Sequence, residues 1–177
     1  MRNMPHPLIL QLRFARSEFK RALEGLSDSD ARRRLLPMNC LSWNIGHLAW
    51  QEQRYWLTRL QGQTPVPQLN ELVGYGQPAC TPPLAEMWDA WQMVTRLADP
   101  FLDTLTTAKL LEKRAFPEWP DDYYTAGTLL QRVIYHYWYH TGENMAIRQM
   151  LGHTNLAEFV GDIDAEAPYI SEAGGGA

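Results

Sequence analysis

The 177-residue sequence lacks the long apolar segments that mark membrane and secreted proteins. No stretch approaches the roughly 20 apolar residues that a membrane-spanning helix needs. The N-terminal segment holds only a short apolar run, Leu8 to Leu10, between prolines and charged residues, which is too short for a signal-peptide core. We therefore predict a soluble cytoplasmic protein that does not contact a membrane.

An excess of basic charge and closely spaced cysteines are also missing. The 16 Lys and Arg against 20 Asp and Glu give a formal net charge of −4, so nucleic acid is not expected as a partner. Cys40 and Cys80 stand far apart and in no CxxC arrangement, which gives no indication of a cysteine zinc site or a thiol redox pair. We expect two buried, reduced thiols.

Aromatic residues and apolar stripes, in contrast, are plentiful. The chain has 7 Trp, 8 Tyr and 45% hydrophobic residues, and its length suits one domain with an aromatic core. No strand-like alternation of any length appears, so we predict an all-α fold. Apolar residues at three- and four-residue steps predict four long helices, over residues 4–26, 42–61, 83–107 and 125–151.

The ends of these helices carry recognisable signals. We expect Ser42 to cap the second helix, Pro100 to bend the third, and Gly62 and Gly152 to end the second and fourth. Residues 62–83 hold five prolines and three glycines, so they should form a long connection. The segment AFPEWPDDYY is expected to be a loop before the fourth helix.

Four helices with apolar stripes bury those stripes by packing against one another. We therefore predict a four-helix bundle over residues 1–165, with a flexible, glycine-rich tail over residues 166–177. The long link between the second and third helices would permit a crossover connection.

The fourth helix places polar side chains in the middle of its apolar stripe. At about 100° per residue, one narrow face carries seven positions. These are Leu129, Val133, His136, His140, Glu143, Ile147 and Leu151. Burying such polar groups without partners costs about 2–7 kcal/mol each, so something must compensate.

A divalent metal ion is one such compensation. His136 and His140 are one helical turn apart and can direct their ring nitrogens at one point. The best third ligand is His47, which lies between Trp43 and Trp50 at helical spacing, whereas His6 and His153 are poorer candidates. Three neutral imidazoles would leave at least one coordination position for water or substrate.

Other interpretations of these residues stay open. The histidine pair is equally compatible with two hydrogen-bonded core histidines, and His47 could face solvent because Gln51 and Arg54 share its stripe. Tyr137 occupies the position where an HExxH protease needs its glutamate, so that mechanism is not supported. The Trp and Tyr residues beside these histidines are compatible with a pocket lining, although aromatics at helical spacing more often form core.

Glu143 and Gly142 also allow several roles. Glu143 fits a further ligand, an acceptor that orients a histidine, a general base, or an ion-pair partner of Arg54. Gly142 inside a helix suggests the close approach of another backbone or of a bound group, with simple tolerance as the alternative.

Two segments resemble the DinB-like superfamily: SWNIGHLAWQEQRYW and YHYWYHTGENMAIRQMLG. This superfamily includes the helical domains of thiol-dependent enzymes of mycothiol, bacillithiol and ergothioneine metabolism, such as the N-terminal domain of mycothiol-dependent maleylpyruvate isomerase. The resemblance covers most of the chain in order and spacing. Its sharpest parts are a histidine after Gly46 and an HxxxH pair followed by a small residue, glycine and Gln or Glu, here His140-Thr141-Gly142-Glu143.

The resemblance implies an up-down-down-up bundle that binds nickel, zinc or iron through His47, His136 and His140. It implies a metal-dependent transferase or isomerase that uses a low-molecular-weight thiol as co-substrate, and a homodimer. Within that activity we expect Glu143 to act as the catalytic proton acceptor. A non-catalytic metal-binding or stress-associated module is the alternative, and a metal-free bundle that merely retains the histidines is the third possibility.

Overall fold

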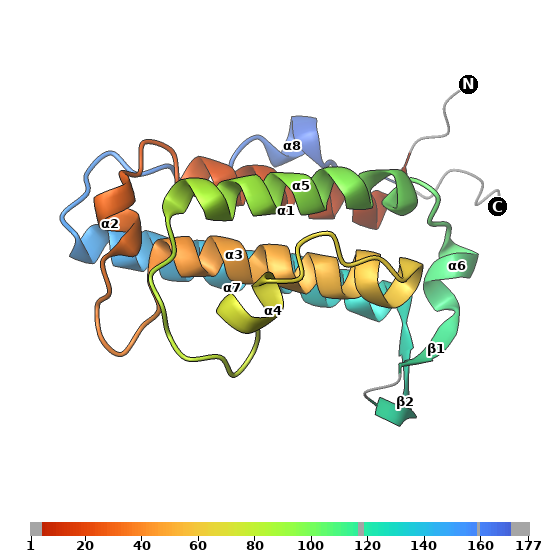
Figure 1. Ribbon diagram of the computed structural model, residues 1–177. Coiled ribbons are helices and arrows are strands. Elements are labelled where there is room, and N and C mark those ends of the chain that lie inside the picture. Colours follow the sequence, from red (N-terminus) through yellow and green to blue (C-terminus); the bar gives the residue numbers. More distant parts are fainter. Residues whose placement is uncertain (1–4, 117–118, 159, 171–177) are drawn as a thin grey trace.

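The computed structural model describes residues 5–116, 119–158 and 160–170, and four long helices dominate it (Figure 1). They are α1 (Pro7–Ala22), α3 (Leu41–Glu52), α5 (Leu84–Leu102) and α7 (Ala126–Met150). Helices α1 and α7 run in one direction along the bundle, and α3 and α5 run in the other (Figure 1). The predicted up-down-down-up four-helix bundle is therefore confirmed.

Shorter elements occupy the connections between the long helices. A π-helical segment, η1 (Gln53–Arg59), continues α3 directly. The remaining helices are α2 (Asp28–Arg32), α4 (Leu69–Leu72), α6 (Thr107–Leu111) and α8 (Ile163–Glu166). The predicted third helix was too long at its C-terminal end, because Pro100 lies inside the last turn of α5 and the chain leaves the helix after Leu102.

A side chain caps the N-terminus of α7, whereas the cap predicted for the second long helix is absent. The hydroxyl of Thr125 accepts a hydrogen bond from the Thr128 amide at the start of α7. Ser42 does not cap α3, because its hydroxyl donates instead to the carbonyl of Pro82 (2.7 Å). Cys40 takes the N-cap position of α3 without a side-chain hydrogen bond.

A two-stranded ribbon replaces the loop expected before α7. Strands β1 (Lys113–Phe116) and β2 (Trp119–Thr125) pair in antiparallel register, with Lys113 opposite Thr125. The ribbon could not be predicted from the sequence, because both strands are short and the second holds a proline. It rests on backbone pairing rather than on an apolar alternation.

The core lies between the four long helices and is rich in aromatic rings, as expected. Trp56, Tyr137, Phe14 and Phe19 are among its fully buried large side chains. In the part of the chain that the structure describes, no helix is both long and apolar enough to cross a membrane. The flexible tail stays a prediction: residues 171–177 lie outside the described residues, while Ala167 is buried and accepts a hydrogen bond from Gln11 (2.8 Å).

The long connection between α3 and α5 runs back along α3 and η1. The carboxamide of Gln53 makes two hydrogen bonds with the backbone of Val66 (2.9 and 2.7 Å). Further along the connection, the indole of Trp50 donates to Asn70 Oδ1 (3.0 Å). Side chains of α3 and η1 therefore hold the connection in place. As a result, the carbonyl oxygen of Val73 lies beside the imidazole of His47.

Candidate metal centre

The structure brings the three predicted histidines together. His47 comes from α3, and His136 and His140 come from successive turns of α7. One ligand nitrogen from each ring lies within 4.8 Å of the others, and this group could hold a metal ion. His47 and His140 are only 7% and 6% exposed, and His136 is partly buried. The interpretation of His47 as a solvent-facing residue is therefore wrong.

Each imidazole points its Nδ1 atom at an oxygen. His47 Nδ1 lies 2.7 Å from the carbonyl oxygen of Val73, and His140 Nδ1 lies 2.7 Å from Glu143 Oε2. His136 Nδ1 lies 2.7 Å from Gln51 Oε1. An oxygen acceptor requires the hydrogen to be on Nδ1, which leaves the Nε2 lone pair of each ring free to bind a metal.

The Nε2 atoms of His136 and His140 face each other at 2.9 Å. With both ring hydrogens on Nδ1, two lone pairs point into the same small space. Such an arrangement is repulsive unless a proton or a metal cation lies between the two nitrogens. The donor set therefore fits a borderline cation such as zinc, nickel or iron, for which imidazole is a suitable ligand.

Burial keeps two of the imidazoles neutral at physiological pH. Desolvation lowers the pKa of His47 to about 4, although its hydrogen bond to Val73 opposes the shift. Desolvation, followed by repulsion from His140 and His47, lowers the pKa of His136 to about 3. Both rings therefore keep the neutral form that metal binding requires.

These shifts make the stability of the metal-free protein depend on pH. In the unfolded chain both histidines bind protons near pH 6.5, whereas in the folded chain they do so only near pH 3–4. The unfolded state therefore gains protons first as the pH falls, and each histidine lowers the free energy of unfolding by up to about 1.4 kcal/mol per pH unit.

We therefore expect the metal-free protein to lose stability as the pH falls from 6.5 to 4.5. Urea unfolding at a series of pH values measures this slope. The double substitution His47→Gln and His136→Gln should flatten it, because neither site titrates any longer. An equally steep slope in the double variant would contradict the assignment to these two histidines.

Aromatic rings surround two of the histidines. Trp43 precedes His47 in the sequence and Trp50 follows it. Both indole rings stack on the imidazole of His47, at centroid distances of 4.5 and 5.1 Å. Tyr139 lies edge-on to His140 at 5.1 Å and is 68% exposed. Trp56 and Tyr137, in contrast, are fully buried. Some of the aromatic residues therefore lie beside the histidines, and others belong to the core.

Glu143 orients a histidine in this structure. Its Oε2 accepts hydrogen bonds from His140 Nδ1 and from the side-chain nitrogen Nδ2 of Asn44 (3.0 Å). The same Asn44 nitrogen also donates to Asn144 Oδ1 (2.8 Å). Among the described residues, the group that could hold a metal ion comprises His47, His136 and His140. Of the roles open to Glu143, this geometry corresponds to the acceptor that fixes a ligand.

Asn44, Gln51 and the carbonyl of Val73 are site groups that the sequence did not reveal. Gln51 had suggested an exposed stripe, yet it is only 8% exposed. The one available signal was spacing, since Asn44, His47 and Gln51 follow one another at three- and four-residue steps on one face of α3.

Other candidate residues lie as expected or differ in detail. His6 caps α1 and His153 accepts from Arg148, so neither belongs to the site. Both cysteines are free; Cys40 is buried and Cys80 is partly buried. Apart from its chain neighbours and its own helix backbone, no atom of the described residues lies within 4 Å of where a Cβ on Gly142 would be. The expected close approach of another backbone is therefore absent from the described part of the chain at this position. At Gly46, in contrast, a Cβ would clash with a side-chain atom, Met87 Sδ.

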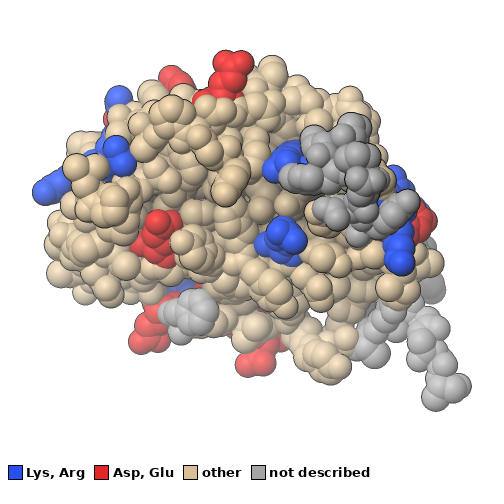
Figure 2. Space-filling model, turned by 90° about the horizontal axis from the view of Figure 1, so that it is seen from below, with Lys and Arg blue, Asp and Glu red and all other residues tan. Residues whose placement is uncertain are grey.

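The molecular surface carries no patch of one charge on the face seen in Figure 2, where single basic and acidic groups are separated by uncharged surface.

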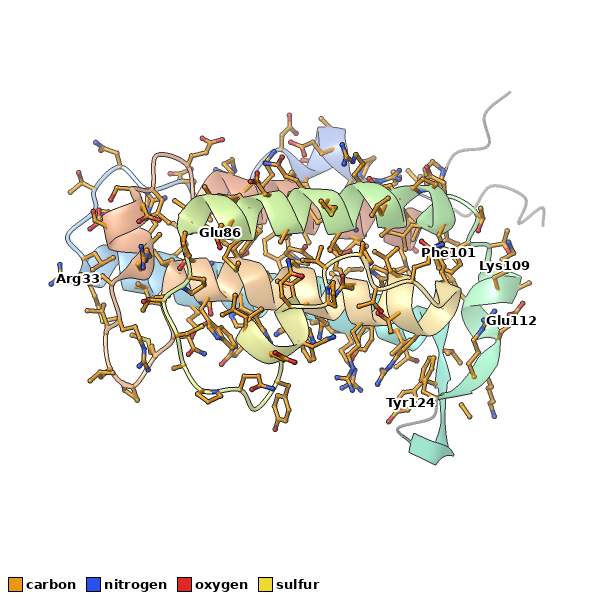
Figure 3. The ribbon with its side chains drawn as sticks, in the orientation of Figure 1. Arg33, Glu86, Phe101, Lys109, Glu112 and Tyr124 are labelled. Atoms are coloured by element: carbon orange, nitrogen blue, oxygen red, sulfur yellow. The ribbon has the colours of Figure 1, made fainter. Side chains whose placement is uncertain are left out.

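Glu86 lies on α5, and Phe101, Lys109 and Glu112 lie at the end of the bundle near α6 (Figure 3). Phe101, Lys109 and Glu112 line a cavity of about 110 Å³ that includes none of the three histidines.

Comparison with known proteins gives one informative match. No curated protein sequence matches the chain. Residues 11–144, however, match the sequence profile of the DinB superfamily. The matched range contains all three histidines and Glu143, and it spans well over half of the chain. The chain therefore belongs to the DinB superfamily.

Proposed function

We propose that the protein is an enzyme that transfers a low-molecular-weight thiol to an electrophilic small molecule, with a divalent ion of nickel, zinc or iron held by His47, His136 and His140. The observation that supports this function is the set of three nitrogen ligands. Structural zinc sites are usually closed by four protein ligands, whereas three leave a position for a substrate. When bound, the ion would lower the pKa of the thiol and so favour the nucleophilic thiolate.

Glu143 is the proposed proton acceptor for this reaction. Its Oε2 is occupied by His140 and Asn44, but its Oε1 has no hydrogen-bond partner among the described residues. The side chain is 23% exposed, so a substrate can reach it. The sulfur would form a bond to the electrophilic carbon while the C–O bond of an epoxide, the π bond of an activated alkene or the C–halogen bond of an aryl halide breaks. The proton that the thiol loses would pass to Glu143, which would return it to the alkoxide or carbanion; a halide would leave as the free anion.

The rings near the histidines favour a substrate with an apolar part. Trp43 and Trp50 cover His47, and the exposed ring of Tyr139 borders His140. A molecule at the open coordination position would contact aromatic carbon more than charge. This composition agrees with binding sites that combine apolar walls with a few polar groups.

A non-catalytic module is the second candidate, and the burial of His47 and His140 favours it. An ion at this position would link α3 to α7 and so stabilise the bundle. In that case removal of the ion should lower the melting temperature and abolish no reaction. An enzyme should in addition exchange small molecules at the open position.

A transfer assay tests the proposed enzyme. Protein loaded in turn with nickel, zinc or iron would be mixed with several cellular thiols and with a panel of electrophiles that includes epoxides, activated alkenes and aryl halides. We expect loss of free thiol with at least one combination, and much slower loss with Glu143→Gln. If no combination reacts faster than the uncatalysed mixture, the proposal of a transferase is wrong.

The homodimer stays a prediction, and a mass measurement in solution checks it. Light scattering after size-exclusion chromatography should give twice the 20.4 kDa of one chain. A mass near that of the single chain at micromolar concentration would contradict the homodimer.

A further inference from the structure

The three histidines are held by acceptors of three different chemical kinds. Val73 offers a backbone carbonyl, Glu143 a carboxylate, and Gln51 a carboxamide. A carbonyl can only accept a hydrogen bond, and an ionised carboxylate behaves in the same way. A carboxamide has an acceptor oxygen at one side and a donor nitrogen at the other. Gln51 is therefore the acceptor whose orientation decides the state of its histidine.

Gln51 reaches across the bundle from the helix that also supplies a ligand. It lies one turn after His47 on α3, and its Oε1 contacts Nδ1 of His136 on α7 at 2.7 Å. The side chain is only 8% exposed, so water does not easily replace this contact. One face of α3 thus provides a ligand and the partner of another ligand.

The orientation of the carboxamide has a direct consequence at the ion position. With Oε1 toward His136, the ring hydrogen is on Nδ1, and the Nε2 lone pair faces His140 Nε2 at 2.9 Å. With the amide nitrogen toward His136, Nδ1 would have to accept, and the ring hydrogen would move to Nε2. That hydrogen would occupy the space between the two rings where the ion would bind.

We propose that Gln51 is a positioning residue that sets the tautomer and direction of His136 and thereby the metal affinity of the site. This inference rests on the proposed metal-binding function. The Oε1 atom of Gln51 contacts Nδ1 of His136, whereas the Nε2 atom of that ring faces His140. Gln51 acts through His136, as groups hydrogen-bonded to metal ligands commonly do.

Two substitutions separate the hydrogen bond from the packing of the side chain. Gln51→Met keeps a similar length but offers no good acceptor, whereas Gln51→Glu keeps an oxygen facing His136. Gln149→Leu, at an exposed position on α7, is the control. Affinity for Zn²⁺ would be measured by competition with a chromophoric chelator. Long-range ¹H–¹⁵N NMR of the metal-free proteins would show which nitrogen of His136 carries the hydrogen.

We expect Gln51→Met to bind Zn²⁺ about 10–100-fold more weakly than the wild type, and Gln51→Glu and the control to stay within about threefold. The NMR spectra should show the hydrogen on Nδ1 in the wild type and in Gln51→Glu, and on Nε2 in part of the Gln51→Met molecules. If Gln51→Met binds Zn²⁺ as tightly as the wild type, or if the hydrogen of the wild-type His136 is on Nε2, the role of Gln51 is wrong and the metal-binding function is unaffected. A wild type that binds no Zn²⁺, Ni²⁺ or Fe²⁺ would overturn the metal-binding function as well.

Discussion

His140→Ala should lower the affinity for a divalent ion by about 100-fold or more, since it removes one of three protein ligands and a loss of even an outer partner costs about 10–100-fold. His140 is the central residue of the group, because its Nε2 faces His136 and its Nδ1 is held by Glu143. The test is metal titration of the purified variant, together with elemental analysis of protein purified without metal-affinity chromatography.

His153→Ala provides the matched control for this experiment. His153 is also a histidine near α7, but its hydrogen-bond partners are Arg148 and Asp30. We expect this variant to keep the wild-type affinity. If His140→Ala binds the ion as tightly as His153→Ala does, the ion is bound elsewhere or not specifically.

The second large effect should come from a buried ion pair in the core. Glu52 is fully buried on α3, and both of its carboxylate oxygens accept hydrogen bonds from Arg16 of α1. The hydroxyl of Tyr137 on α7 also donates to Glu52 Oε1 (2.6 Å), and Trp91 of α5 donates to that hydroxyl (2.7 Å). The network therefore joins all four long helices.

Glu52→Ala should reduce the free energy of unfolding by about 3–5 kcal/mol, because it leaves the Arg16 guanidinium in the core without its main partner. Urea unfolding followed by circular dichroism measures the change. Asp99→Ala is the control: Asp99 also bonds Arg16 (2.7 Å), but its side chain is 40% exposed. Partial exposure limits its contribution to about 1 kcal/mol or less. A loss below 1 kcal/mol for Glu52→Ala would show that the network does not stabilise the bundle.

The sequence predicted the long helices because their apolar stripes and end signals are local. Gly62 and Gly152, for example, both adopt positive φ angles (70° and 85°) immediately after the helical segments that they were expected to end. The antiparallel ribbon before α7 was missed because its two strands are short and the second holds a proline, so no apolar alternation marks them. Ser42 was misassigned as a cap because its actual partner, Pro82, lies 40 residues away in the sequence.

At the site, too, local features could be predicted from the sequence and distant partners could not. The spacing of His136 and His140 is a local feature, and their need for compensation inside an apolar stripe pointed to a third group. The partners Val73 and Gln51 could not be predicted in this way. Val73 contributes a backbone atom that no residue type reveals, and the partner of Gln51, His136, lies on another helix, 85 residues away. Periodicity alone does not distinguish a polar residue that faces solvent from one that faces another helix.

Anomalous diffraction from crystals grown with Ni²⁺ or Zn²⁺ would show whether one ion lies between the three histidines. We expect one strong anomalous peak per chain, about 2.0–2.2 Å from Nε2 of His47, His136 and His140. Each Nδ1 should keep its contact with Val73, Gln51 or Glu143. A peak at another position, or three imidazoles in contact with protein groups through Nε2 and without an ion between them, would contradict the account.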